Sequence, residues 1–327
     1  MPLMYAAVFD VFGTPAEVIQ HTKMAIPEPG LGEVRLKLVL SPIHTHDLLI
    51  IRGMYGIKPT LPCIGGSEAL AIVDKLGEGV TDLSIGDRVI AAGISSAWSE
   101  YFIAHAKSVI PIPETLPDEI AAQLVAMPVS AMMALNKLKP RASEWIIVNA
   151  ANGAVGKTIA QIAVSRGVRV ACLVTRTEAK QDLEDCGASD IFVTTDINWR
   201  NSLTDAIGND RVAGGIDMIS GTLAGEMLHL ISEGGLLLSF GNMSNKPMQI
   251  EPADLIFKEI TIKGFWGTKE SERASADEMR AMISELIQLG LSGQLKLPVA
   301  GIFSLSRITE AVTASDRKRN GKIMIRP

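Results

Sequence analysis

Residues 146–156, Ile-Ile-Val-Asn-Ala-Ala-Asn-Gly-Ala-Val-Gly, decide how this chain can fold. The apolar start predicts a buried strand, and residues 157–164, Lys-Thr-Ile-Ala-Gln-Ile-Ala-Val, continue with the spacing of an amphipathic helix. The glycines between them allow a tight turn and let a pyrophosphate approach backbone N–H groups at the helix N-terminus, where the helix dipole favours negative charge. The turn therefore predicts a dinucleotide site, with candidate cofactor contacts at Asn152, Gly153, Ala154, Val155 and Gly156.

Ala151 stands where the usual dinucleotide fingerprint has its first glycine, so the surrounding sequence must support the prediction. Arg166 and Gly167 end the helix, and residues 168–174 form a second apolar run rich in valine. Strand, helix and parallel strand fit within about thirty residues, the length of a βαβ unit. The turn is thus expected inside a parallel sheet.

The overall composition favours a globular protein. With 327 residues the chain is long enough for two cores, and no apolar run approaches the length of a membrane helix, about twenty residues. The net charge of −5 argues against nucleic acid or an anionic membrane as the main partner. Cys63, Cys172 and Cys186 are too widely spaced for a disulfide framework or a close thiolate pair, and no basic stretch leads a long apolar segment at the N-terminus. We therefore expect a cytoplasmic protein.

The hydrophobic pattern changes near residue 118. Short strand-like runs separated by Gly, Pro and Asp precede it and predict a β-rich, partly barrel-like region at 5–9, 33–40, 69–76, 88–92 and 101–104. Strands then alternate with helices, which predicts strands at 145–149, 168–174, 190–193, 215–219, 235–240 and 260–265. The expected fold class is α/β: a doubly wound Rossmann sheet of six parallel strands, with the cofactor across the strand C-termini, plus a β domain.

Other motifs along the chain are similar to those of one family. They are residues 47–56 (Asp-Leu-Leu-Ile-Ile-Arg-Gly-Met-Tyr-Gly), 61–68 (Leu-Pro-Cys-Ile-Gly-Gly-Ser-Glu), 85–89 (Ile-Gly-Asp-Arg-Val), 214–217 (Gly-Gly-Ile-Asp) and 239–241 (Ser-Phe-Gly). With the glycine turn they resemble the medium-chain dehydrogenase/reductase superfamily nearly end to end. The resemblance implies a GroES-like catalytic domain from residues 1–118 and 268–327 and a Rossmann cofactor-binding domain from residues 119–267.

Two branches of this superfamily lack zinc, the quinone oxidoreductases and the 2-enoyl thioester reductases. Residues 242–247 (Asn-Met-Ser-Asn-Lys-Pro) and 264–266 (Gly-Phe-Trp) resemble the second branch, and Ala151 in the turn is what the zinc-independent enzymes show. The resemblance implies NADPH-dependent hydride transfer to the C2=C3 double bond of acyl-CoA or acyl-carrier-protein thioesters. An NADPH-dependent quinone oxidoreductase and a non-catalytic NADPH-binding protein remain the alternatives.

Reduction of an enoyl thioester needs a donor for the negative charge that develops on the thioester oxygen. Tyr55 matches the family's active-site tyrosine, and a phenol stays protonated at neutral pH; the alternative is a tyrosine half-buried for packing. Trp266 follows a predicted strand, where its indole either walls the acyl pocket or packs at an interface.

Cofactor choice depends on the end of the second predicted strand. An NAD enzyme places Asp or Glu there, whereas this chain has Thr175 and Arg176, and a cation suits the 2′-phosphate of NADPH. Glu178 keeps NADH open as an alternative. By resemblance, further cofactor contacts are expected from Gly241, Met243 and Phe265.

His44 and His46 invite a metal interpretation. Relatives that bind zinc also use a histidine before Glu68 and a later thiolate, but position 67 is serine here and residues 125–130 contain neither Cys nor His, so we expect no metal. The two histidines replace Asn and Ser of the family's Asn-Pro-Ser-Asp, and His44 or His46 is expected to contact the nicotinamide ribose or to shuttle protons. A homodimer formed through the edge strand at residues 259–265 is also implied.

Overall fold

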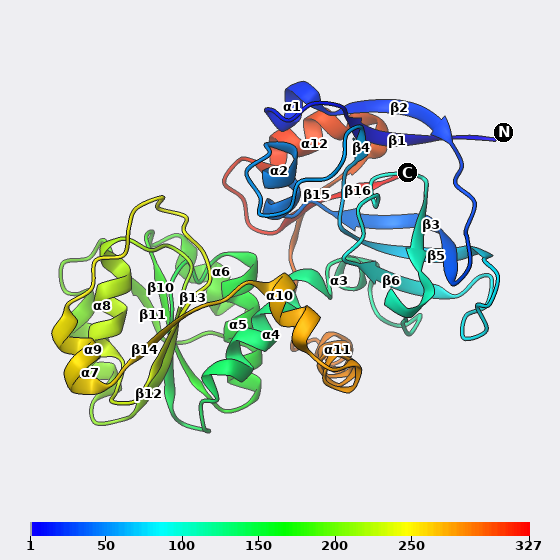
Figure 1. Cartoon of the computed structure of the whole chain (residues 1–327). Helices are drawn as coiled ribbons and strands as arrows, with labels where there is room; N and C mark the ends of the chain where they lie inside the picture. Colours follow the sequence, from blue (N-terminus) through cyan, green and yellow to red (C-terminus); the bar gives the residue numbers. More distant parts are fainter. Residues whose placement is uncertain (1) are drawn as a thin grey trace. The chain divides into compact units, whose positions relative to one another are not determined.

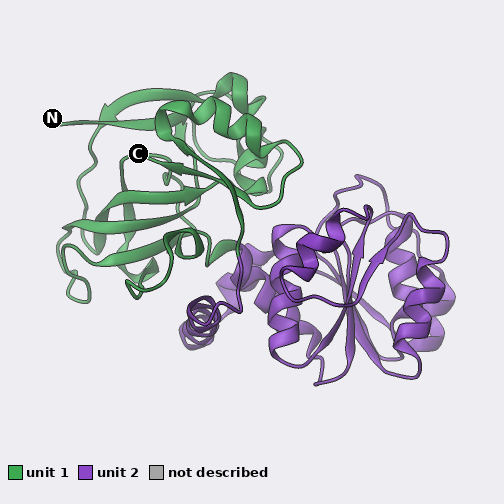
Figure 2. Cartoon of the chain, turned by 180° about the vertical axis from the view of Figure 1, so that it is seen from behind, with its two compact units in different colours: residues 1–126, 297–327 green, residues 127–296 purple. Residues whose placement is uncertain are grey.

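A computed structural model describes residues 2–327 of the chain. It contains two compact units (Figure 2): unit 1 takes the chain up to Ala126 and again from Leu297, and unit 2 takes Met127–Lys296. Within residues 2–327, no helix has both the length and the apolar character that a bilayer span requires.

Unit 1 is built mainly from antiparallel strands. Its strands are β1 (Leu3–Phe9), β2 (Gln20–Ala25), β3 (Glu33–Pro42), β4 (Cys63–Ile64), β5 (Glu68–Leu76), β6 (Arg88–Ala92), β7 (Tyr101–His105), β8 (Val109–Pro111), β15 (Val299–Ser304) and β16 (Lys322–Arg326). One sheet has the order β2-β1-β4, and a seven-stranded sheet has the order β15-β16-β3-β5-β6-β8 with β7 also paired to β3 (Figure 1). Its helices are α1 (Pro15–Val18), α2 (Thr45–Ile51), α3 (Asp118–Ala121) and α12 (Ile308–Ser315).

Strand β3 shows why these residues form sheet. Val34, Leu36 and Leu38 recur at every second position and are buried, which turns one face of the strand into the core. At its C-terminal end β3 pairs with β16, where Met324 faces Pro42. The last strand of the chain therefore completes a sheet that the first forty residues begin.

Unit 2 is a parallel sheet covered by helices on both faces (Figure 1). Its strands are β9 (Trp145–Val148), β10 (Arg169–Val174), β11 (Ile191–Val193), β12 (Val212–Asp217), β13 (Leu236–Ser239) and β14 (Thr261–Gly264). Its helices are α4 (Ala126–Leu138), α5 (Ala154–Ser165), α6 (Ala179–Glu184), α7 (Trp199–Ile207), α8 (Thr222–Leu230), α9 (Pro252–Lys258), α10 (Gly267–Arg273) and α11 (Ala276–Leu291).

The strand order in unit 2 is β11-β10-β9-β12-β13-β14, and every neighbouring pair is parallel. The order reverses between β9 and β12, which makes their carboxyl ends the switch point of a doubly wound sheet. All four residues of β9 are buried, as a strand covered on both faces requires. The predicted fold class, a Rossmann sheet of six parallel strands plus a GroES-like β domain, is confirmed.

The boundaries of the two units differ from those placed on the sequence at 118 and 268. Helices α10 and α11 belong to unit 2 because their contacts lie there: Arg166 forms two hydrogen bonds with Glu285 of α11, at 3.1 and 3.0 Å, and Lys137 of α4 pairs with Glu270 of α10. These contacts join segments that are 119 and 133 residues apart, and hydrophobic periodicity does not show which distant segments meet.

Candidate functional site

The glycine turn joins β9 to α5 in unit 2. Ala150 adopts a left-handed φ of 47°, and the Gly153 N–H donates to the Ala150 carbonyl at 2.9 Å. Gly153 caps the twelve-residue α5, which begins at Ala154. A Cβ atom on Gly156 would lie 2.6 Å from the Cα of Ala151, so the first turn of α5 packs directly against the loop. Only glycine at position 156 permits this approach.

A buried network holds the two strand ends at the switch point. Asn149, directly after β9, donates its amide N–H to Asp217 Oδ1 at 2.5 Å, and its amide oxygen accepts the Met218 N–H at 2.7 Å. Asp217 Oδ1 also accepts the N–H groups of Ile219 and Ser220, at 3.0 and 2.9 Å. The network sets the backbone of the loop after β12, and sequence reasoning did not single out either side chain at its centre.

The remaining predicted cofactor residues follow other strands of the same sheet. Thr175 and Arg176 come directly after β10 and are exposed. Gly241 and Met243 follow β13, and a Cβ on Gly241 would meet the Met218 carbonyl at 3.0 Å. Phe265 follows β14 and stacks on Phe240, with ring centroids 5.0 Å apart. The structure therefore brings the predicted set to the carboxyl edge of one sheet.

These residues fit a dinucleotide. Gly153 and Gly156 carry no side chain at the start of α5, and the first N–H groups of a helix attract phosphate. Thr177 and Lys180, which follow the exposed Arg176 in the chain, help to line a pocket of unit 2. A cation and a polar lining at this strand end suit a phosphorylated ribose.

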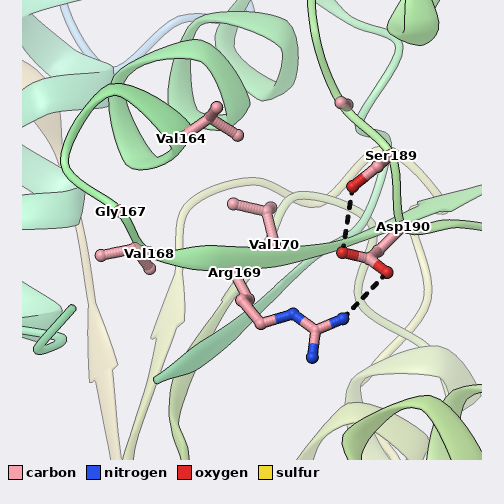
Figure 3. A pocket seen from close by; sticks show the side chains of 8 residues that line it. Val164, Gly167, Val168, Arg169, Val170, Ser189 and Asp190 are labelled. Carbon is pink, nitrogen blue, oxygen red and sulfur yellow. Dashed lines mark hydrogen bonds and ion pairs between the residues drawn. The ribbon is translucent and has the colours of Figure 1, made fainter. Parts of the chain in front are cut away.

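A second pocket of unit 2 lies at the other end of the sheet (Figure 3). Arg169, the first residue of β10, donates to Asp190 Oδ1 at 3.3 Å, and the Ser189 hydroxyl donates to Asp190 Oδ2 at 3.2 Å. Ligands of open parallel sheets bind at the carboxyl ends of the strands, whereas these residues precede or begin theirs. We therefore leave this pocket outside the candidate site.

Tyr55 lies in unit 1, four residues beyond the end of α2. Gly53 turns the chain with a φ of 68°, and a Cβ there would lie 3.1 Å from the ring of Phe12. Tyr55 is half-buried, and its ring centroid lies 5.9 Å from that of His46.

The two histidines at the start of α2 have different surroundings. His44 is fully buried, and its Nε2 lies 2.7 Å from Glu68 Oε2. His46 stacks on His44 with ring centroids 5.0 Å apart and keeps 20% of its side chain exposed, while its Nε2 lies 2.6 Å from the Ser67 hydroxyl. The structure thus brings His46, rather than His44, to Tyr55.

Glu68 is the buried carboxyl of this cluster. Its Oε1 accepts the N–H groups of Val125 and Ala126, at 2.6 and 3.0 Å, just where the chain leaves unit 1. Burial raises the pKa of Glu68 to about 7. The sequence drew attention to Glu68 only as part of a motif, because its partners are 24 and 57 residues away.

Burial holds the pKa of His44 well below its usual value, and the charge of Lys322 on β16 adds to the effect. A second proton on His44 would need an acceptor at Nδ1, and that buried atom has no hydrogen-bond partner among residues 2–327. Burial also lowers the pKa of Lys322 to about 8. Burial therefore disfavours the charged forms of His44, Glu68 and Lys322 in this cluster of unit 1.

Trp266 caps the N-terminus of α10 in unit 2, two residues after β14. It is 39% exposed, and Lys269 Nζ lies 5.8 Å from the centre of its ring. Its expected role at a substrate pocket stays a prediction. In the part of the chain that the structure describes, no group of three His, Cys, Asp or Glu side chains is arranged to hold a metal ion.

Comparison with known proteins identifies the family. The family model of the alcohol dehydrogenase GroES-like domain matches residues 30–114, and that of the zinc-binding dehydrogenases matches residues 154–287. The mitochondrial enoyl-[acyl-carrier-protein] reductase of Bos taurus is 30% identical over 320 residues, which cover 95% of this chain and 85% of that protein. The corresponding Xenopus tropicalis protein is 31% identical over 302 residues, covering 89% and 86%.

Solved structures agree on the fold. Escherichia coli quinone oxidoreductase complexed with NADPH matches with a TM-score of 0.88 at 24% identity, covering 99% of this chain and 100% of that one. A mycobacterial quinone oxidoreductase gives the same TM-score, identity and coverage. The chain therefore belongs to the medium-chain dehydrogenase/reductase superfamily, as an oxidoreductase of its zinc-independent quinone and enoyl reductase type.

Proposed function

We propose that the protein is an NADPH-dependent reductase of 2-enoyl thioesters carried on coenzyme A or acyl carrier protein. The observation that carries the proposal is the 30% identity, over 95% of the chain, to a protein named enoyl-[acyl-carrier-protein] reductase. Residues 242–247 and 264–266, which resemble that branch, support it.

Residues of unit 2 hold the cofactor in this account. The N–H groups from Gly153 to Gly156 receive the pyrophosphate, and Arg176 pairs with the 2′-phosphate. Gly241, Met243 and Phe265 contact the remainder of the cofactor. When bound, NADPH supplies the hydride that adds to the β carbon of the substrate.

Tyr55 of unit 1 is the proton donor in this account. Its hydroxyl donates to the thioester oxygen as negative charge develops there, or passes its proton to the α carbon. The cluster behind it, His46 with Ser67, keeps the residues around the phenol ordered. Trp266 contributes an apolar wall for the acyl chain.

The test is NADPH consumption with crotonyl-CoA, longer enoyl-CoA thioesters and naphthoquinone. We expect turnover of the thioesters, and a loss of about 10²–10⁴-fold in kcat for Tyr55→Phe. Tyr5→Phe is the matched control, since Tyr5 is another tyrosine of unit 1 that stacks on a histidine, His21. Unchanged thioester reduction in Tyr55→Phe would exclude Tyr55 as the donor.

A quinone oxidoreductase is the second candidate, favoured by the match to the Escherichia coli structure over 99% of the chain. Turnover of naphthoquinone without any turnover of thioesters would select it. Tight NADPH binding with no turnover of either would select a non-catalytic binding protein.

The homodimer remains a proposal. Strand β14 is the last strand of its sheet, and Ile256 and Phe257 of the preceding helix α9 are 66% and 80% exposed. An exposed sheet edge beside apolar side chains favours association with a second copy. Sedimentation of Phe257→Asp tests this, with a monomer as the expected result. The cytoplasmic location also stays a prediction, and the relatives named above are mitochondrial proteins.

A further inference from the structure

The proposed function gives His46 no chemical step, although its ring lies next to that of Tyr55. His46 sits in the first turn of α2 and has three neighbours: its ring stacks on His44, its Nε2 lies 2.6 Å from the Ser67 hydroxyl, and its ring centroid lies 5.9 Å from that of Tyr55. The side chain is 20% exposed, so the ring is also in contact with solvent.

The geometry of this cluster suits proton transfer. An imidazole can take a proton at one nitrogen and release one at the other. Nε2 of His46 is held by Ser67 at 2.6 Å. The ring centroids of His46 and Tyr55 are 5.9 Å apart, which makes the imidazole and the phenol neighbouring rings.

We propose that His46 is a proton-relay residue that returns a proton to Tyr55 after each reduction, with Ser67 orienting its ring. The inference rests on the proposed function, since it needs Tyr55 to lose a proton in every cycle. It also gives a role to the histidine that stands in place of the serine of the family's Asn-Pro-Ser-Asp motif.

The return of a proton from His46 to Tyr55 completes the proton balance of the catalytic cycle. Hydride forms the new C–H bond at the β carbon, and the electrons of the double bond move onto the α carbon and the thioester oxygen. The Tyr55 O–H bond breaks and its proton forms the C–H bond at the α carbon. Protonated His46 then returns a proton to the Tyr55 oxygen and recovers one from solvent, so each turnover consumes one NADPH and one solvent proton.

The neighbours of His46 explain why this histidine, and not His44, serves. His44 shares its proton with Glu68 and has no exposed surface, so it cannot exchange with solvent directly. The charged groups around His46 are Asp47 on its own helix, with Oδ1 3.6 Å from Nε2, and the buried Glu68 and Lys322 behind His44. Asp47 is therefore the anion that lies next to the ring.

Two substitutions separate proton transfer from packing. His46→Gln keeps a side chain that can hydrogen-bond Ser67, but its amide neither takes up nor releases a proton at neutral pH. His46→Ala leaves space for added imidazole. His21→Gln is the matched control, because His21 is an exposed histidine of unit 1 that also stacks on a tyrosine, with centroids 4.4 Å apart. Melting temperature and NADPH affinity are measured on each variant, to show that it is folded and binds the cofactor.

The assay is kcat for crotonyl-CoA reduction, with and without imidazole, in H2O and D2O. We expect His46→Gln and His46→Ala to lose about 10²-fold in kcat. Imidazole should restore His46→Ala several-fold, and the solvent isotope effect on kcat should rise because proton return becomes slow. The kcat of His21→Gln should equal that of the wild type and should not change when imidazole is added.

Wild-type kcat in folded His46→Gln, or no rescue of folded His46→Ala by imidazole, overturns the relay while leaving the proposed function standing. A wild-type protein that reduces no thioester at all overturns the proposed function and the relay with it. The two failures are therefore distinguishable from the wild-type measurement alone.

Discussion

Glutamine at position 68 should change how stability depends on pH. In the folded protein, burial raises the pKa of Glu68 from its ordinary value of 4.5 to about 7, although two backbone N–H groups partly stabilise the anion. A raised pKa in the folded state contributes stability that is present below the unfolded value and is lost as pH rises through the folded value. The loss therefore falls between about pH 4.5 and pH 7.

The size of this effect follows from the two pKa values. At about 1.4 kcal/mol per pH unit, ionising the buried carboxyl costs about 3 kcal/mol by pH 8. The amide of Glu68→Gln can still accept the N–H groups of Val125 and Ala126 but does not ionise. Part of this cost is already present at pH 5, so we expect the wild type to lose about 2.5 kcal/mol of unfolding free energy relative to Glu68→Gln between pH 5 and pH 8.

Urea denaturation at pH 5, 6, 7 and 8 measures the difference. Lys322, whose pKa burial lowers to about 8, titrates at the upper end of this range and is present in both proteins. The lowered pKa of His44 gives stability that is lost as pH falls below the ordinary histidine value, and His44 is present in both proteins. Glu17→Gln, an exposed carboxyl on α1, is the control. Parallel pH curves for wild type and Glu68→Gln would refute the reasoning.

Three further predictions concern unit 2. Gly156→Ala should destabilise the protein by about 1–3 kcal/mol and weaken NADPH binding, because the new Cβ would lie 2.6 Å from Ala151 Cα. Gly264→Ala is the control. Its Cβ would meet nothing within 4 Å, so the melting temperature should stay unchanged. Asp217→Ala should cost at least about 2 kcal/mol in urea unfolding, because the N–H groups of Ile219 and Ser220 lose their acceptor; wild-type stability would show that this network is not needed. Arg176→Gln should raise the KM for NADPH about 10–100-fold and leave the KM for NADH unchanged. The size of this change follows from the free energy of a hydrogen bond to a charged group. Equal changes for both cofactors would argue against a 2′-phosphate contact.

The sheet of unit 2 was predictable because its information is local. Each strand is a short apolar run followed by a turn, and residues 146–156 carry the turn chemistry within eleven positions. The same holds for β3, whose alternate residues face the core. Patterns of this kind need no knowledge of distant contacts.

Elements that depend on distant or polar contacts were not predicted from the sequence. Strand β2 is almost wholly exposed, so no alternation marks it, and its register comes from pairing with β1. Strand β15 pairs with β16, 23 residues further along at Val299 and Lys322. Helix α10 is polar and buries no residue, and Lys137 of α4 forms an ion pair with its Glu270.

The candidate site divides in the same way. The resemblance supplied Tyr55 and the cofactor contacts at Gly241, Met243 and Phe265. The glycine turn and the end of the second strand supplied the other cofactor residues. The approach of His46 to Tyr55 and the burial of Glu68 against His44 join residues from separate segments of unit 1, which no local pattern encodes. Asn149 and Asp217 likewise meet only because β9 and β12 are neighbours in the sheet.

The most direct test of the proposed activity follows the hydride itself. The protein is incubated with crotonyl-CoA and NADPH deuterated at the transferable position of the nicotinamide, and the product is analysed by mass spectrometry and NMR. The account predicts butyryl-CoA that carries one deuterium at its β carbon and a solvent-derived hydrogen at its α carbon. Unchanged crotonyl-CoA beside rapid reduction of naphthoquinone, or deuterium at the α carbon, would contradict it.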